Sequence, residues 1–143
     1  MLVRDSPQPI AWRGSPGQVR SLHGGAVGMV FLAFDPPARQ AVLDAGLTAY
    51  TAASVTDTGV LDARIEQVRR QGWAFVAGER EVGLHTVAAP IRDPAGQLAA
   101  AVAISGPSFR MPPEQASQLA ALVTGTAEKI SQALAKGADQ PWA

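Results

Sequence analysis

The chain contains no cysteine, only two histidines and a single tyrosine among its 143 residues. Without cysteine it can form neither a disulfide scaffold nor a thiol-based active site, which agrees with a location in the reducing cytoplasm. The chain also has no excess of charge of either sign, because twelve basic residues balance twelve acidic ones. This balance argues against a free-standing nucleic-acid-binding module, which would normally carry a basic patch.

Long apolar runs are absent as well. No run approaches the roughly 18 residues typical of a membrane helix, and the first ten residues lack the charged-then-apolar layout of a signal peptide. Nevertheless 47% of the residues are hydrophobic, which is enough for a core in a chain of single-domain length. We therefore expect one cytoplasmic domain over residues 1–136, no membrane partner, and a flexible tail over residues 137–143.

The residue patterns of enzymes are lacking too. His23 and His85 stand alone, without the paired spacing of a metal site. No base stands at a readable spacing from Ser105, so no catalytic triad is indicated. The glycine-rich stretch from Gly24 to Gly28 lacks the Lys-Ser/Thr of a nucleotide-binding loop. The sequence predicts no enzyme activity, no metal and no cofactor.

The most informative segment that is present predicts a hairpin. Thr86–Arg92 and Leu98–Ser105 read as strands, joined by a turn that contains Pro94 and Gly96. Alternation predicts one buried face in each strand, made of Val87, Ala89 and Ile91 in the first and of Leu98, Ala100, Val102 and Ile104 in the second. The many alanines in both strands leave room above the sheet for a helix or a ligand.

The rest of the chain supplies helices and short strands. Helices are predicted over residues 25–34, 36–44, 57–70 and 112–134, from apolar spacing, capping residues and prolines in the first turns. Short strands are predicted over residues 2–4, 10–12 and 73–76. This order does not alternate strictly, so we expect an α/β (α+β) domain with a mostly antiparallel sheet flanked by helices.

Three segments resemble one known family, in the same order and spacing and together over roughly residues 2–134. They are Ala88–Arg110 (AAPIRDPAGQLAAAVAISGPSFR), Arg20–Phe34 (RSLHGGAVGMVFLAF) and Gly72–Phe75 (GWAF) followed by Glu79 and Gly83. The chain resembles the C-terminal effector-binding domain of the IclR-type bacterial transcriptional regulators. The resemblance implies a GAF-like or profilin-like fold.

The resemblance also implies partners. Members of the family begin with a winged helix-turn-helix, and nothing in the first thirty residues of this chain has that pattern. We therefore expect an effector domain that contacts DNA only through a missing N-terminal domain, and that associates with itself as a dimer or tetramer. A dimerisation module without a ligand and a small GAF-like enzyme are the alternative functions.

Finally, the resemblance implies a binding site for a small organic acid. The backbone N–H groups of Ala26 and Val27 would hold the carboxylate, as the positive end of a helix dipole can. Met29 stands where the family usually has lysine, which removes a cation. The pocket-lining positions in the sheet are Val76, Thr86, Ala103 and Ser105.

The chemistry of these positions favours an acid with an apolar or aromatic body. By the resemblance, Val76 and Ala103 replace family residues that could form hydrogen bonds; the alternative is that both are simply core residues. The hydroxyls of Thr86 and Ser105 could bind either the effector or a backbone carbonyl. We expect Glu79, Arg80 and Glu81 to form a solvated face or the rim of a lid, and His23 to bind loop backbone. Arg110 could reach a ligand carboxylate or cap the last helix.

Overall fold

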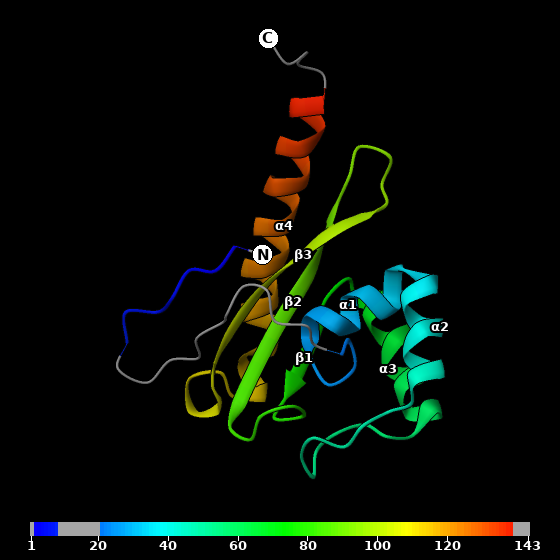
Figure 1. Cartoon of the computed structure of the whole chain (residues 1–143). Helices are drawn as coiled ribbons and strands as arrows, with labels where there is room; N and C mark the ends of the chain where they lie inside the picture. Colours follow the sequence, from blue (N-terminus) through cyan, green and yellow to red (C-terminus); the bar gives the residue numbers. More distant parts are fainter. Residues whose placement is uncertain (1, 9–20, 139–143) are drawn as a thin grey trace.

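A computed structural model describes residues 2–8 and 21–138 of the chain. Within these residues the structure is an antiparallel sheet with helices on both faces (Figure 1), as the sequence predicts. The elements in chain order are α1 (Ala26–Phe34), α2 (Pro36–Ala45), α3 (Thr58–Gln71), β1 (Ala74–Ala77), β2 (Leu84–Arg92), β3 (Leu98–Pro107), two short 3-10 helices (Ser108–Arg110 and Pro113–Gln115) and α4 (Ala116–Ala138).

The helix ends follow the local signals. The Asp35 side chain accepts a hydrogen bond from the Ala38 N–H at the start of α2, and Asp57 accepts one from the Val60 N–H at the start of α3. Both bonds satisfy donors that the first helical turn leaves without a partner. At the end of α3, Gly72 takes a left-handed conformation with φ +80°, which costs glycine little.

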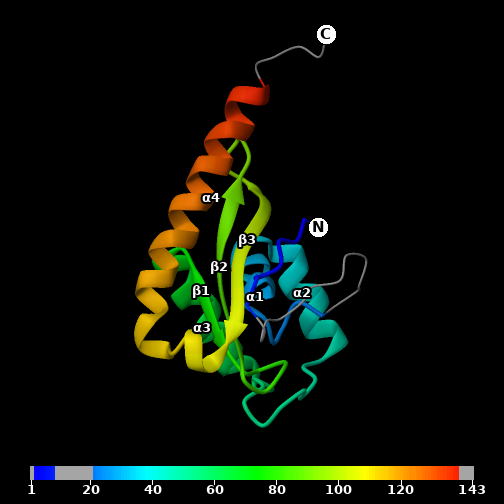
Figure 2. The ribbon, with the colours of Figure 1, turned by 90° about the vertical axis from the view of Figure 1, so that its left-hand side faces the viewer.

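The sheet has the order β1-β2-β3, and both strand pairs are antiparallel (Figure 2). The register aligns Val76 with Thr86 and Thr86 with Ser105, so these three residues form a row across the sheet. The hairpin is longer than predicted, because pairing continues from Ser105 to Pro107. Its turn closes through the N–H of Gly96, which donates to the Asp93 carbonyl at 2.9 Å.

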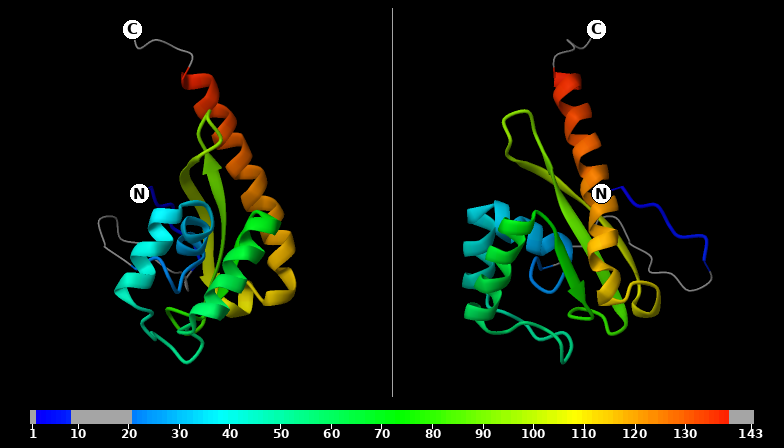
Figure 3. Two further views of the ribbon diagram at one scale, coloured as in Figure 1. Left: turned by 90° about the vertical axis from the view of Figure 1, so that its right-hand side faces the viewer. Right: turned by 180° about the vertical axis from the view of Figure 1, so that it is seen from behind.

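Each face of the sheet packs against a different helix layer (Figure 3). The face that carries Val76 and Ala88 shares a core with α1 and α3. The opposite face is covered by α4, whose buried stripe is Ala120, Val123 and Ala127. The predicted face of Val87, Ala89 and Ile91 is confirmed, and it meets this α4 stripe.

The predicted buried face of the second strand is wrong at Leu98, which lies on the other face, and at Ile104, which is exposed. The ladder between β2 and β3 shifts register beside Arg92, so that Arg92 pairs with Leu98 whereas Ile91 pairs with Ala100. One extra residue of this kind is a β-bulge, and it moves the preceding side chain to the other face. Leu98 therefore packs in the α1 core, while Ala100 and Val102 pack against α4.

Other boundaries also differ from expectation. Residues 2–4 form no strand, and the strand predicted over residues 10–12 lies outside the described residues. The sequence leaves open whether Leu122 or Val123, and Thr126 or Ala127, face the core from the last helix, and in α4 it is Val123 and Ala127 that do so. Helix α4 continues to Ala138, two residues into the predicted tail, and residues 139–143 lie outside the described part.

No helix among the described residues is both long and apolar enough to cross a membrane.

The start of α1 lies unusually close to the loop before it. A β-carbon on Gly28 would lie 1.5 Å from the carbonyl oxygen of Leu22. This contact is far shorter than any van der Waals separation, and the obstacle is backbone rather than a mobile side chain. Only glycine lets the preceding loop turn this tightly against the helix.

We therefore expect Gly28→Ala to destabilise the domain by about 3 kcal/mol or more, since it overpacks a rigid contact. Gly125→Ala is the matched control, because a β-carbon there meets nothing within 4 Å and alanine in a helix is better than glycine by about 0.5–1 kcal/mol. Urea denaturation measures both variants. Equal stability of Gly28→Ala and the wild type would show that the loop can move away.

Candidate functional site

The four sheet residues of the predicted site share one face, and it is the face that α1 covers. Val76, Thr86 and Ser105 form one cross-strand row, and Ala103 lies in the neighbouring row opposite Ala88. Because side chains alternate along a strand, residues in these two rows point to the same side of the sheet. The core on that side contains Val76 and Ala88 together with Ala26 and Met29 of α1.

The hydroxyls of Thr86 and Ser105 pair with one another. Their oxygens are 3.0 Å apart, and both residues are partly buried. Among residues 2–8 and 21–138, neither hydroxyl has a backbone carbonyl as its partner, which was the alternative left by the sequence. A mutual hydrogen bond uses one of the two hydroxyl protons. The second proton is left to donate to an acceptor such as a carboxylate.

The N-terminus of α1 has no side-chain cap. Gly25 precedes the helix, and the first helical bond runs from the Met29 N–H to the Gly25 carbonyl at 2.9 Å. The N–H groups of Ala26, Val27 and Gly28 therefore precede the helical ladder. Together they form the positive end of the helix dipole, which favours an anion. Ala26 is buried and Val27 is 37% exposed.

The remaining three predicted positions differ in character. Met29 is only 3% exposed and lies in the core with Val76, so its side chain points into the packed interior. Val76 is likewise a core residue, which was one of its two predicted readings. Ala103, in contrast, is exposed, so its small side chain lies on an accessible part of the sheet.

Three loops meet beside the start of α1. The buried ring of His23 accepts a hydrogen bond from the Thr48 N–H at 2.8 Å, as its predicted role in binding loop backbone requires. Tyr50 lies 5.4 Å from the His23 ring, and the Arg80 guanidinium lies 4.4 Å from the centre of the Tyr50 ring. Arg80 also donates to the Ser21 carbonyl at 3.2 Å.

The prediction that Glu79 belongs to a solvated face is wrong. Glu79 is 3% exposed, and its carboxylate forms an ion pair with Arg64 of α3. Its backbone carbonyl accepts from the hydroxyls of Ser54 and Thr51, which fixes the loop before α3 against the β1–β2 hairpin. A carboxylate can be buried when a cation and hydrogen bonds compensate its lost hydration.

Two other polar residues, Arg110 and His85, make contacts in the connection between β3 and α4. The Arg110 guanidinium lies 5.6 Å from the centre of the Phe109 ring, next to it in the chain. His85 pairs through Nδ1 with the Met111 carbonyl at 2.8 Å. Neither contact brings its residue to the start of α1. Among residues 2–8 and 21–138, no cluster of three potential metal ligands occurs.

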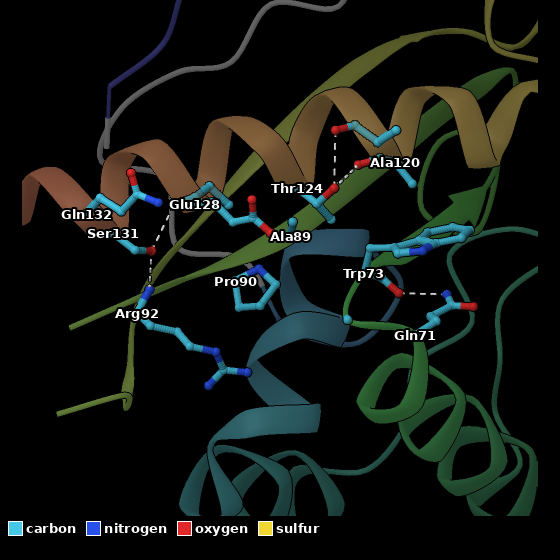
Figure 4. A pocket seen from close by; sticks show the side chains of 13 residues that line it. Gln71, Trp73, Ala89, Pro90, Arg92, Ala120, Thr124, Glu128, Ser131 and Gln132 are labelled. Atoms are coloured by element: carbon cyan, nitrogen blue, oxygen red, sulfur yellow. Dashed lines mark hydrogen bonds between the residues drawn. The ribbon is translucent and has the colours of Figure 1, made fainter. Parts of the chain in front are cut away.

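A groove of about 630 Å³ lies elsewhere, between β2 and α4 (Figure 4). Three of its polar side chains already have partners: Ser131 accepts from the Arg92 N–H, Thr124 donates to the Ala120 carbonyl, and Gln71 donates to the Trp73 carbonyl. The Arg92 guanidinium turns away toward the Phe34 ring. With Glu128 on its rim, this groove is poorly suited to an acid.

An antiparallel sheet with α1 and α3 packed on one face and α4 on the other defines the class of domain, and comparison with known proteins identifies the family. The family described as bacterial transcriptional regulator IclR, C-terminal, matches residues 4–132. The regulator BhcR of Paracoccus denitrificans is 32% identical over 126 residues, which are 87% of this chain and 45% of BhcR. The chain therefore belongs to the IclR family of transcriptional regulators, as its effector-binding domain.

Solved structures show the same fold. A transcriptional regulator from Rhodococcus sp. RHA1 superimposes with a TM-score of 0.86 at 29% identity, over 93% of this chain and 55% of that one. The inducer-binding domain of PobR from Acinetobacter shares the fold with a TM-score of 0.71 at 22% identity, over 77% of this chain and 65% of that one. The chain thus spans about half the length of the full regulators. Its relatives are regulators rather than enzymes, which confirms the prediction of no enzyme activity.

The buried ion pair of the site yields a stability prediction. Arg64→Met should lower the free energy of unfolding by about 1–3 kcal/mol, because it leaves the Glu79 carboxylate buried without its cation. Adding Glu79→Gln to this variant should restore part of the loss, since a neutral amide costs less to bury. Urea denaturation of the two single variants and the double variant measures the coupling. Additive effects would contradict a direct ion pair.

Proposed function

We propose that this domain senses a small organic acid with an apolar or aromatic body. The observation that carries the proposal is that the uncapped start of α1 and the Thr86–Ser105 hydroxyl pair belong to the same side of the sheet. An acid bound between them would place its carboxylate at the N–H groups of Ala26 and Val27. The hydroxyl proton of the Thr86–Ser105 pair that is not used in their mutual hydrogen bond would donate to a second polar atom of the ligand.

The surroundings favour an apolar body for the ligand. Ala103 lies next to the hydroxyl row, is exposed and presents only a methyl group, and its neighbours on the same face, Ala88 and Val76, are buried carbon side chains. Such a surface offers no hydrogen bonds to a very polar two- or three-carbon keto acid, but it can bury the carbon atoms of a larger one. One structure with the same fold, a double mutant of the PobR inducer-binding domain, is a complex with 3-hydroxybenzoic acid, and this compound is a suitable first probe.

The regulatory output of the domain follows from its family. IclR regulators bind both DNA and small-molecule effectors. We propose that an acid bound here changes how a helix-turn-helix domain of the whole regulator binds its operator. We also propose that the effector domains associate with one another, so that an acid bound to one of them affects the DNA-binding domains of both subunits. The balanced charge of this chain predicts no specific DNA binding by the effector domain itself.

A panel of carboxylic acids tests the proposal by thermal shift and calorimetry. Aromatic acids such as 3-hydroxybenzoate should stabilise the domain, by about 2.7 kcal/mol at one hundred times the dissociation constant. Glyoxylate should give a much smaller effect. A clear response to glyoxylate with none to aromatic acids would contradict the apolar part of the proposal.

The variant Ser105→Ala separates binding from folding. If the hydroxyl pair meets the ligand, this change should weaken binding by roughly 1–2 kcal/mol and leave the melting temperature nearly unchanged. Ser117→Ala, on the exposed first turn of α4, is the matched control and should change neither quantity. Unaltered affinity with a lower melting temperature for Ser105→Ala would assign the pair to structure alone.

A further inference from the structure

Arg80 and Tyr50 are brought to the start of α1 from two different loops. Gly24, two residues before the helix, has φ +82°, and a β-carbon there would lie 3.3 Å from Cδ2 of Tyr50 and 4.0 Å from Cβ of Arg80. The guanidinium of Arg80 rests on the Tyr50 ring, 4.4 Å from its centre. It also donates to the Ser21 carbonyl in the loop that leads into the helix.

We propose that Arg80 is the residue that selects an anionic effector at this site. The inference rests on the proposed function and adds the source of the positive charge. Arg80 lies against the glycine turn before the helix, so a carboxylate at the N–H groups of Ala26 and Val27 is within reach of its long side chain. Tyr50 positions the guanidinium by a cation–π contact.

The charges of the neighbouring residues support this assignment. Helix α1 has no acidic residue in its first turn and no basic residue in its last, and Met29 is buried in the core. The Arg64 guanidinium is already paired with Glu79, and Arg92 is turned toward Phe34 on another part of the domain. The two contacts that Arg80 makes within the described part of the chain are weaker: one is with an aromatic ring and one with a neutral carbonyl. A carboxylate would be a stronger partner for it than either.

If Arg80 recognises the carboxylate, removing its charge should weaken the binding of an acid but not of the corresponding neutral amide. Comparing both ligands in the wild type and in Arg80→Met measures this difference. The probes are 3-hydroxybenzoate and phenylacetate, each compared with its neutral amide by calorimetry. The wild type should bind each acid at least about tenfold more tightly than its amide, as a charge-assisted hydrogen bond requires. In Arg80→Met this preference should fall to about twofold or less, while amide binding stays unchanged.

Two variants act as controls for this cycle. Arg70→Met removes the same charge from an exposed position near the end of α3, and it should keep the full preference for the acid. Arg80→Lys keeps the charge but loses the planar fork that stacks on Tyr50, so it should retain part of the preference, more than Arg80→Met does. Each control is read from the ratio of its acid affinity to its amide affinity. A substitution that destabilises the protein and weakens both affinities equally leaves this ratio unchanged.

Tyr50 offers a second readout, because it is the only tyrosine of the chain. Labelling with 3-fluorotyrosine gives a single fluorine resonance, whose shift reports whether the guanidinium lies on the ring. Addition of the acid should move this resonance in the wild type, whereas the amide should move it much less. In Arg80→Met, addition of the acid should no longer move the fluorine resonance.

The outcomes separate the two proposals. If the wild type binds the acids and Arg80→Met keeps the same acid-to-amide ratio, the assignment of Arg80 is wrong and the proposed function stands. If the wild type binds neither acid nor amide at millimolar concentration, the proposed function fails, and the role of Arg80 fails with it.

Discussion

The packing of α1 on a sheet face of small side chains is the constraint on which the rest of the structure depends. Alanines of β1 and β2 let the helix approach closely, and they share a core with Ala26 and Ala33 of α1. Gly28 allows the preceding loop to turn tightly against the helix, because any side chain at this position would collide with the Leu22 carbonyl. Larger residues at these positions would lift the helix and separate its N-terminus from the sheet.

The position of α1 determines what the site can do. Its uncapped N–H groups supply a partial positive charge, the Thr86–Ser105 pair supplies a hydroxyl proton, and the nearby alanines supply apolar surface. The loops around the helix start are fixed independently, by the Glu79–Arg64 ion pair and by the hydrogen bond between Thr48 and His23. A ligand would therefore meet a framework that is already organised, which reduces the entropy lost on binding.

Much of this arrangement could be predicted from the sequence, because the signals are local. Alternation gave the face of Val87, Ala89 and Ile91, and the capping residues Asp57 and Gly72 gave the ends of α3. The bulge beside Leu98 could not be foreseen, since one unpaired residue leaves no compositional trace. The burial of Glu79 depends on Arg64, fifteen residues away, and the contact of Tyr50 with Arg80 depends on how two loops fold together.

The most direct test of the account follows the backbone amides at the start of α1. A domain labelled with nitrogen-15 can be titrated with 3-hydroxybenzoate while its amide resonances are recorded. The account predicts that the Ala26 and Val27 amides shift most strongly, as donors to a carboxylate, together with residues around Thr86 and Ser105. Saturable shifts confined to the groove between β2 and α4, with Ala26 and Val27 unchanged, would contradict it.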